Sequence, residues 1–389
     1  MQTNPVHPVN PVLFWSVAAN ALFDRSGSLK IVTIVGARPQ FIKAAPVSQA
    51  LRRHHHEILI HTGQHYDRAM SDLFFEELSI PRPNYELGIG SGLHGWQTGQ
   101  MLQRIEDVLV AEKPAWVLVY GDTNSTLAGA LAAVKLQIPV AHVEAGLRSF
   151  NRTMPEEHNR VLTDHCADLL FCPTQTAVNL LAAEGVTRGV HLVGDVMIDA
   201  LQTHGALAAR NSTLADRLGL RPRGFALATI HRPYNTDDPA RLAVILSALS
   251  GLQTPVVFPV HPRTRAALTR ADLTLPANVI ATEPIGYLDM LALEQAAALI
   301  LTDSGGVQKE AYCFAAPCVT LRPETEWVET VQAGWNRLAW GDAAQVIEAA
   351  RRPWPTTPPP PLFGDGHAAG RIVSLLAAAD PAPQKVVAS

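Results

Sequence analysis

Short hydrophobic runs alternate with longer stretches of helical periodicity along the chain from residue 30 onward. The predicted strands form two series, and the first comprises residues 31–35, 58–61, 116–120, 138–142, 169–172 and 191–193. The second series comprises residues 225–230, 255–260, 279–282, 298–302 and 318–321. Near-continuous hydrophobic strands that alternate with helices are typical of parallel sheets covered on both faces. The pattern therefore predicts an α/β protein with two doubly wound domains that face one another.

The break between the two series falls in the polar stretch 203–223. We expect a first domain over residues 30–200 and a second over residues 201–375. The proline-rich run 353–361 is expected to form a rigid connector before a last helix over residues 368–378. Residues 1–29 are expected to be a disordered extension, and residues 376–389 a frayed tail.

The apolar run at residues 12–23 is the candidate targeting segment of the extension. It is too short to cross a bilayer, and no Lys or Arg precedes it, so it lacks the basic start of a signal peptide. No other apolar stretch of the sequence is long enough to cross a membrane. We therefore expect a cytoplasmic protein that does not associate with membranes.

The amino-acid composition argues against several classes of protein. Of the 389 residues, 47% are hydrophobic and 17% are charged, which excludes a mainly disordered chain. The net charge of −4 argues against a nucleic-acid-binding protein, which normally carries a basic excess. Four cysteines are too few for a disulfide scaffold and have no zinc-site spacing, so we expect buried thiols and no metal.

Polar residues follow six of the predicted strands. Ligands of doubly wound sheets bind beyond the carboxyl ends of the strands, so these segments predict a ligand between the two domains. The six segments are Gly36-Ala37-Arg38-Pro39-Gln40, Gly121-Asp122-Thr123, Glu144-Ala145-Gly146-Leu147-Arg148, His231-Arg232-Pro233, His261-Pro262-Arg263 and Asp303-Ser304-Gly305-Gly306.

The turn Ser304-Gly305-Gly306 leads from a strand into a helix. Free backbone N–H groups at the positive end of a helix form a phosphate site, although the same pattern also fits a plain tight turn. Glu310 lies one turn further along, where a carboxylate can accept hydrogen bonds from ribose hydroxyls. The chain has no G-x-x-x-x-G-K-[ST] and no G-x-G-x-x-G motif, which disfavours ordinary nucleoside-triphosphate and dinucleotide sites.

Three acids, Asp122, Glu144 and Glu156, converge on the same predicted cleft. Proton transfer is a natural use for them, but Asp122 and Glu156 are equally expected as helix caps or as partners of helix dipoles. Arg38 and Lys43 follow the first strand, where they would either neutralise a diphosphate or remain solvated surface charges.

His231 ends a strand of the second series, opposite the acids. A single histidine in such a place is more often structural than catalytic. Its position beside the predicted phosphate site favours a functional role.

Taken together, these motifs resemble the non-hydrolysing UDP-N-acetylglucosamine 2-epimerase family, whose GT-B fold consists of two Rossmann-like domains. The resemblance extends from about residue 30 to about residue 375. It rests on GARPQFIKAAP (36–46), HTGQHYDRAMSDLFFEEL (61–78), GDTNSTLAGALAA (121–133), HVEAGLRSFNRTMPEEHNRVLTDH (142–165), VGDVMIDAL (193–201), TIHRP (229–233), LTDSGGVQKEA (301–311) and TEWVE (325–329).

The resemblance implies a UDP-sugar substrate, no cofactor, no metal and a homodimer. It also implies a role for each candidate residue. The implied roles are acid/base work for Asp122, Glu144 and Glu156, a place beside sugar and diphosphate for His231, diphosphate contacts for Arg38 and Ser304-Gly305-Gly306, a ribose contact for Glu310, and positions near the nucleotide for Lys43 and Arg322.

The chain departs from the family pattern in several segments, among them GARPQFIK, where typical members have GTRPE, and TGQHYD, which differs from the QHR-type segment of allosterically activated members. Tyr234 replaces the glutamate of the usual HR-x-E-N segment, which puts the nearby hydrogen bonding in doubt. Lys309 lies in DSGGVQKE, where typical members have DSGGIQEE, and Trp327 lies in TEWVE, where they have TERPE. In these segments the chain looks most like the subgroup that acts on UDP-2,3-diacetamido-2,3-dideoxyglucuronate.

Conversion of UDP-GlcNAc to UDP-ManNAc is the function that we expect, and the diacetamido-glucuronate sugar is the alternative substrate. A hydrolysing epimerase, a GT-B glycosyltransferase and a non-catalytic nucleotide-sugar binder are further alternatives. A binder has no need of acids around a sugar ring, so the set of Asp122, Glu144, Glu156 and His231 argues against that class.

Overall fold

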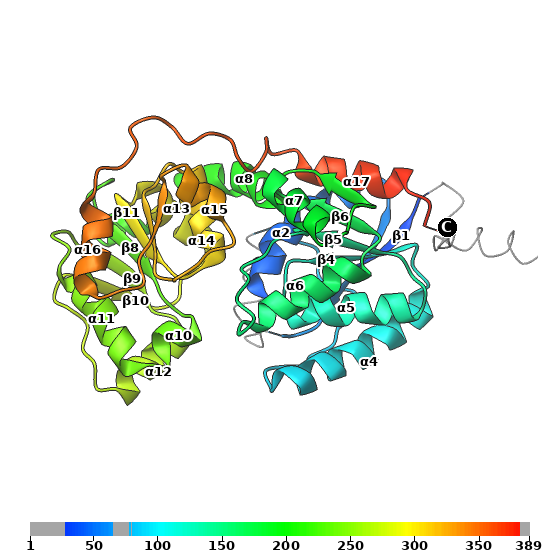
Figure 1. Ribbon diagram of the computed structural model, residues 1–389, viewed down its shortest axis with the longest axis horizontal. Coiled ribbons are helices and arrows are strands. Elements are labelled where there is room, and N and C mark those ends of the chain that lie inside the picture. Colours follow the sequence, from blue (N-terminus) through cyan, green and yellow to red (C-terminus); the bar gives the residue numbers. More distant parts are fainter. Residues whose placement is uncertain (1–27, 65–77, 79, 382–389) are drawn as a thin grey trace, which may run out of the picture.

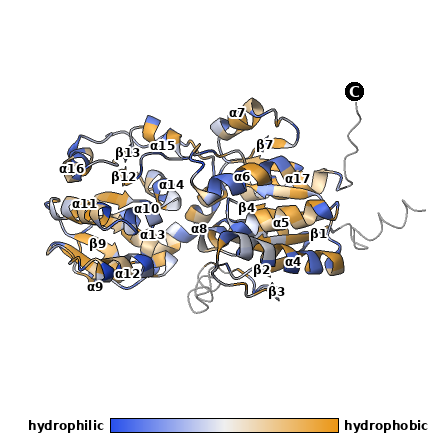
Figure 2. Ribbon diagram, turned by 60° about the horizontal axis from the view of Figure 1, so that its bottom comes forward, coloured by the Kyte–Doolittle hydropathy of each residue, from blue (hydrophilic) through white to orange (hydrophobic). Residues whose placement is uncertain are grey.

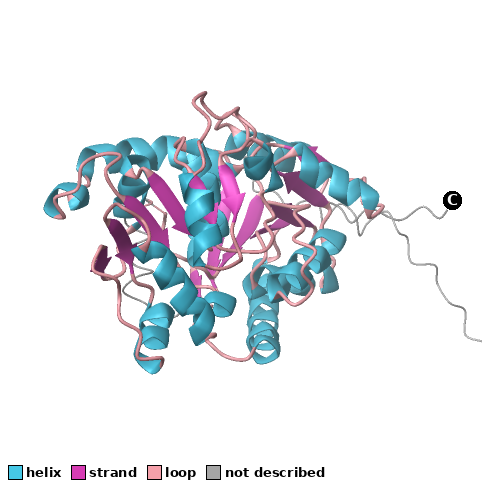
Figure 3. Ribbon diagram, turned by 60° about the vertical axis from the view of Figure 1, so that its left-hand side comes forward, coloured by secondary structure: helices cyan, strands magenta, loops and turns pink. Residues whose placement is uncertain are grey.

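The computed structural model describes residues 28–64, 78 and 80–381. Most of the predicted extension 1–29, most of the predicted tail 376–389 and residues 65–77 of one quoted motif therefore lie outside the described residues. Figure 1 shows two groups of strands side by side, each enclosed by helices, and Figure 3 shows the same layers from another direction. The predicted architecture of two α/β domains is confirmed.

Within the described residues, the first domain contains a seven-stranded sheet in which all pairs are parallel. In spatial order the strands are β3 (Tyr85–Glu86), β2 (His56–His61), β1 (Lys30–Val35), β4 (Trp116–Tyr120), β5 (Val140–Val143), β6 (Leu169–Cys172) and β7 (Val190–Leu192). The central strands β1, β4, β5 and β6 are almost wholly buried, because helices cover both faces of the sheet.

Two hydrophobic clusters hold these helices to the sheet. One cluster includes Phe41, Ala200 and Ile372, and the other includes Met101, Ile105 and Ala128. The helices of this domain are α2 (Arg38–Leu51), α4 (His94–Glu112), α5 (Asn124–Lys135), α6 (Pro155–Cys166), α7 (Gln175–Ala183) and α8 (Val196–Asn211). In Figure 2 the hydrophobic colouring of α5 follows from its alanine-rich sequence, which allows it to pack closely.

The second domain contains a six-stranded parallel sheet within the described residues. Its strands, in spatial order, are β10 (Val279–Thr282), β9 (Val256–Pro259), β8 (Ala226–Thr229), β11 (Leu299–Thr302), β12 (Cys318–Thr320) and β13 (Asn336–Leu338). Its helices are α9 (Leu214–Arg217), α10 (Pro233–Thr236), α11 (Pro239–Ser250), α12 (Pro262–Arg270), α13 (Tyr287–Ala296), α14 (Gly305–Cys313), α15 (Val328–Gln332) and α16 (Ala343–Arg351).

Every predicted strand is present, with ends shifted by at most two residues. The prediction missed β3 and β13, which lie at the outer edges of the two sheets. Each pairs with one neighbour only, and Tyr85–Glu86 and Asn336–Leu338 lack the continuous hydrophobic character of a central strand.

Two segments connect the domains. Helix α8 leads from the first sheet to the second, and the proline-rich segment 352–367 returns from α16 to the last helix, α17 (Ala368–Ala378) (Figure 1). Although the sequence-based division placed residues up to 375 with the second domain, α17 packs against α2 and α8 beside the first sheet.

No described helix combines the length and the apolar composition needed to span a bilayer. The four cysteines are free; Cys172 and Cys318 are buried, and Cys166 and Cys313 are partly buried.

Candidate active site

The turn after β1 is built around Gly36. A Cβ atom at this position would lie 2.0 Å from Thr62 Oγ1, so only glycine fits. Gln40 accepts a 2.8 Å hydrogen bond from the Gly36 N–H and donates one of 2.9 Å to Tyr120 O, which fixes the start of α2. Arg38 begins this helix, but its side chain lies outside the described part. Lys43, one turn later, is buried and points toward the end of β5.

Glu144 follows β5 in an unusual backbone conformation. Its φ of 71° lies in the left-handed region, which costs a residue other than glycine about 1–3 kcal/mol. The N–H groups of Glu144 and Ala145 both donate to Phe171 O at 3.1 Å, and these bonds hold the conformation. Such strain is characteristic of functional sites, and here it turns the Glu144 carboxylate toward the second domain.

Two lysines share the Glu144 carboxylate. Lys43 binds one oxygen, and Lys309 of α14 donates a 2.9 Å hydrogen bond to the other. Burial alone would raise the pKa of Glu144, but the two ammonium groups lower it to about 2. The Glu144 side chain is only 7% exposed, so Glu144 is a fixed anion in the wall between the two domains.

Asp122 follows β4 and Gly121, whose φ is 62°. The interpretation of Asp122 as the cap of α5 is wrong, because Thr123 is the N-cap and accepts a hydrogen bond from the Thr126 N–H. The Asp122 carboxylate instead forms an ion pair with Arg160 of α6, and 34% of its side chain remains exposed. Asp122 is therefore a carboxylate that a ligand in the cleft can reach.

Glu156 lies in the first turn of α6, where it also benefits from the helix dipole. It is not the cap, since Met154 holds that position. Its Oε1 accepts a 3.1 Å hydrogen bond from Arg232 Nη1 of the second domain, and one third of its side chain is exposed.

The neighbouring Glu157 has a structural role. It accepts hydrogen bonds from the N–H groups of Ser149 and Phe150 and forms an ion pair with Arg160 at 3.1 Å.

His231 is positioned through the buried Asp303. The N–H groups of His231 and Arg232 donate to the Asp303 carboxylate at 2.9–3.1 Å, and His231 Nδ1 lies 3.2 Å from Oδ1. Asp303 thereby joins the loop after β8 to the loop after the adjacent strand β11. The His231 side chain is 35% exposed, and its ring lies 5.5 Å from the ring of His261.

Ser304, Gly305 and Gly306 form the start of α14, and all three are partly exposed. A Cβ at Gly305 would lie 2.7 Å from Glu326 Oε1, which shows how closely that carboxylate approaches the helix start. Glu326 also forms a 2.9 Å ion pair with the fully buried Arg322. Apart from this ion pair, the Arg322 guanidinium has no hydrogen-bond partner among the described residues.

Glu326 lies at the centre of an arginine cluster. Burial acts to raise its pKa, but Arg322, Arg160 and Arg232 lower the pKa to about 2. Since Arg160 belongs to the first domain and the other two arginines to the second, their positive charges converge from both sides. With an exposed helix start beside it, this cluster can bind an anionic group such as a diphosphate.

Glu310 lies deeper than predicted for a residue that contacts a ribose. It is 4% exposed and accepts a 3.1 Å hydrogen bond from the buried Tyr287 hydroxyl. Burial raises the pKa of Glu310 to about 7, against the opposing effects of Tyr287 and Lys309. The fully buried Glu294 lies next to it, and burial followed by the charge of Glu310 raises its pKa as well.

The structure thus brings together Asp122, Glu144, Glu156, Lys43, His231, Arg322 and the start of α14, whereas the Glu310 carboxylate lies behind them. Sequence reasoning placed Arg232 in the segment after β8 without a role of its own, and it did not identify Arg160, Glu326 or Asp195, which is the N-cap of α8. Arg160 follows Glu156 by four residues, so helical spacing alone places it on the same face of α6.

The departures from the family pattern also have physical explanations. Tyr234 packs edge-on against Trp340 with ring centroids 5.6 Å apart. Asn235 holds the loop instead, since it donates to Asp303 at 3.0 Å and to Leu321 O at 3.1 Å. Lys309 and Trp327 contact each other, with the Lys309 ammonium 3.9 Å from the centroid of the indole ring.

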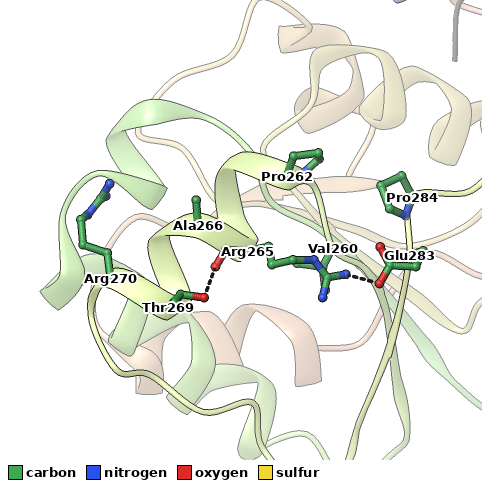
Figure 4. A pocket seen from close by; sticks show the side chains of 8 residues that line it. All are labelled: Val260, Pro262, Arg265, Ala266, Thr269, Arg270, Glu283 and Pro284. Atoms are coloured by element: carbon green, nitrogen blue, oxygen red, sulfur yellow. Dashed lines mark hydrogen bonds and ion pairs between the residues drawn. The ribbon is translucent and has the colours of Figure 1, made fainter. Parts of the chain in front are cut away.

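A pocket of about 670 Å³ opens at the carboxyl ends of β9 and β10 (Figure 4). Val260, Pro262 and Pro284 give it an apolar lining, and Arg265 donates a 2.8 Å hydrogen bond to Glu283 at its side. Pro262 belongs to one of the six predicted segments, but none of the residues with an implied role in the reaction or in substrate binding lines this pocket. In the described part of the chain, no group of three His, Cys, Asp or Glu side chains is arranged to hold a metal ion.

Residues 49–377 match the sequence profile of the UDP-N-acetylglucosamine 2-epimerase family. A UDP-N-acetylglucosamine 2-epimerase homolog of Methanococcus maripaludis is 53% identical over 90% of this chain and 99% of its own length. The UDP-2,3-diacetamido-2,3-dideoxy-D-glucuronate 2-epimerase of Pseudomonas aeruginosa is 52% identical over the same shares.

The crystal structure of Methanocaldococcus jannaschii UDP-GlcNAc 2-epimerase in complex with UDP-GlcNAc and UDP is also similar. It has 43% sequence identity and a TM-score of 0.84, over 90% of this chain and 100% of that chain. This likeness confirms the GT-B fold. Because the profile and the relatives span both domains, the chain belongs to the UDP-N-acetylglucosamine 2-epimerase family.

Proposed function

We propose that the protein interconverts UDP-GlcNAc and UDP-ManNAc by non-hydrolysing epimerisation at C2. The observation that carries this proposal is the meeting of two kinds of groups in one cleft. Asp122, Glu144 and Glu156 of the first domain face the arginines and the exposed helix start of the second. The first set suits proton transfer at a sugar, and the second set suits a departing diphosphate.

The chemistry requires both sets. The C2 hydrogen of a UDP-sugar is not adjacent to a carbonyl, so a side chain cannot simply remove it. Cleavage of the C1–O bond releases UDP with the bonding electron pair and leaves an oxocarbenium-like centre, which makes the C2 proton acidic. A carboxylate then takes that proton to give a 2-acetamidoglucal. Reprotonation from the other face and return of UDP to C1 complete the epimerisation.

The geometry supports a division of roles among the three acids. Asp122 and Glu156 are each about one third exposed, so they are the carboxylates able to exchange protons with C2. Glu144 is buried between two lysines and has a pKa of about 2, which makes it a weak base. A permanent anion there stabilises the positive charge that develops at C1.

UDP-2,3-diacetamido-2,3-dideoxyglucuronate is the second candidate substrate. The chain is 52% identical to the Pseudomonas aeruginosa enzyme named for that sugar and 43% identical to the Methanocaldococcus jannaschii UDP-GlcNAc enzyme. Lys309 and Trp327 lie in the segments in which the chain looks most like the subgroup that acts on that sugar.

Proton NMR in D2O, with each UDP-sugar supplied separately, tests the proposal. We expect a second epimer and deuterium at C2 with UDP-GlcNAc. The same result with the diacetamido-glucuronate sugar alone would transfer the assignment to that substrate. Free sugar that accumulates in step with UDP would identify a hydrolysing epimerase. No reaction with either sugar would favour a glycosyltransferase or a binder. The homodimer and the cytoplasmic location remain predictions.

A further inference from the structure

Lys309 joins three segments of the chain that are distant in sequence. It belongs to α14 of the second domain, and its side chain is 1% exposed. Its ammonium group donates to Glu144 at 2.9 Å and to Asp195 at 2.5 Å, and it lies over the ring of Trp327. Two carboxylates and an aromatic face therefore surround this cation, and their interactions compensate for the hydration that it loses on burial.

Both carboxylates occupy positions that matter for domain geometry. Glu144 ends β5 at the cleft, in its left-handed conformation. Asp195 is the N-cap of α8, the helix that leads to the second domain, and its other oxygen accepts a 2.9 Å hydrogen bond from the Met197 N–H. A single side chain thus connects the reaction cleft, the connecting helix and the second domain.

The charges around this point balance only when Lys309 is present. Lys43 from α2 and Lys309 from α14 oppose Glu144 and Asp195. Among the described residues, Glu310 and Cys313 of α14 and Asp199 of α8 also interact with this cluster. Without Lys309, Glu144 would keep only Lys43, and the buried Asp195 would lose the ammonium group paired with it. Such an imbalance disfavours ionisation of Glu144.

We propose that Lys309 is a positioning residue, which keeps Glu144 ionised and oriented at the cleft and couples that state to closure of the two domains. The proposal rests on the proposed function, because it assigns Glu144 the part of a fixed anion. It explains why a lysine is buried between the domains, paired with carboxylates from two other segments.

The test uses the full chain with Lys309→Met, Lys309→Arg and the control Lys30→Met. The control breaks the partly buried Lys30–Glu112 ion pair at the start of β1, away from the cleft. The pH profile of kcat/KM is measured on the UDP-sugar that the wild-type protein epimerises. Lys309→Met leaves the buried Glu144 with one cation instead of two, so the pKa of Glu144 should rise by about four units from its value of about 2. The ratio of kcat/KM at pH 5 to that at pH 7.5, which measures the acidic limb of the profile, should then fall about tenfold below the wild-type ratio. Lys309→Arg should restore the wild-type limb, and Lys30→Met should not change it. An unchanged limb in folded Lys309→Met would overturn the proposal.

Asp195→Asn covers the case in which Lys309→Met does not fold. Asparagine still caps α8 and leaves Lys309 paired with Glu144, so the acidic limb should not rise. A limb that rises in this variant would contradict the proposal.

Small-angle X-ray scattering gives a readout that is independent of turnover. Without UDP, Lys309→Met should have a larger radius of gyration than the wild type, whereas Lys30→Met should not. Equal radii for Lys309→Met and wild type would overturn the coupling to closure. A wild-type protein inactive on both UDP-sugars would overturn the proposed function, while the scattering comparison would still decide this part of the inference.

Discussion

Arg232 donates a 3.1 Å hydrogen bond to Glu156 across the boundary between the two domains. The bond joins the loop after β8 to the first turn of α6, so it exists only while the domains are together. Arg232 also interacts electrostatically with Glu326 and Asp122, so a movement of Arg232 changes the environment of these acids. Domain closure and the environment of the acids are therefore physically linked.

Glu156→Gln tests whether the charge of Glu156 is used in proton transfer. Glutamine retains an oxygen that can accept the Arg232 hydrogen bond but cannot act as a base. We expect kcat to fall by about 10²–10⁴ while UDP binding is largely kept. Steady-state kinetics and calorimetry measure the two quantities, and Glu348→Gln, which alters an exposed pair with Arg352, is the matched control. Near-native turnover of Glu156→Gln would remove Glu156 from the mechanism.

Asp122→Asn should have an effect of similar size, about 10²–10⁴ in kcat, because Asp122 is the other accessible carboxylate. The loss of charge leaves Arg160 paired with Glu157, so the fold should persist. Asp365→Asn, at an exposed ion pair with Arg371, serves as the control. Circular dichroism checks that Asp122→Asn is folded, and near-native turnover of the folded variant would contradict the assignment.

Gly305→Ala tests the helix start as the diphosphate site. The added methyl group would lie 2.7 Å from Glu326 Oε1 and 3.4 Å from Trp327 Nε1, so the Glu326–Arg322 pair must shift. We expect the Kd for UDP to rise about tenfold or more, which corresponds to about 1.4 kcal/mol. Gly99→Ala on α4, where a Cβ meets nothing within 4 Å, should leave binding unchanged. Equal affinities in both variants would place the diphosphate elsewhere.

The raised pKa of the buried Glu310 carboxyl group predicts that the stability of the folded protein falls as the pH rises. Its pKa is about 7 in the folded protein and 4.5 ordinarily, so the folded state holds the proton more tightly than the unfolded chain. The associated stability is fully present below pH 4.5 and is lost as the pH rises through 7. Glu310→Gln should therefore raise Tm by roughly 5 °C at pH 8 and have little effect at pH 4.5, as measured by calorimetry.

The same variant addresses the predicted ribose contact. Weaker binding of UDP by Glu310→Gln would support that contact. Unchanged binding would mean that this buried carboxyl group does not bind the nucleotide. A stability gain that did not depend on pH would instead contradict the raised pKa.

The sequence predicted most of the fold because central parallel strands must be hydrophobic on both faces. Edge strands such as β3 and β13 escape this constraint, and they were missed. The return of α17 to the first sheet was also missed, since its apolar face specifies burial but does not specify a partner.

The candidate site was predicted less completely than the fold. Strand ends identified Asp122 and Glu144 at one edge of the first sheet and His231 at an edge of the second, because parallel topology gathers the carboxyl ends of the strands of each sheet. The ion pairs of Arg232 with Glu156 and of Lys309 with Glu144 depend on how two domains meet, and no local pattern encodes that meeting. Glu310 is buried because α14 packs against α13 within the second domain, which places it beside Tyr287 and Glu294.

The central claim is that the cleft breaks the C1–O bond to UDP before the proton at C2 is exchanged. Positional isotope exchange tests it most directly, with UDP-GlcNAc labelled by ¹⁸O in the bridge between C1 and the β-phosphorus, and with ³¹P NMR as the readout. We predict that the label scrambles into the non-bridging β-phosphate oxygens while C2 acquires deuterium from D2O. Deuterium at C2 without scrambling would contradict the elimination of UDP and, with it, the roles assigned to both domains.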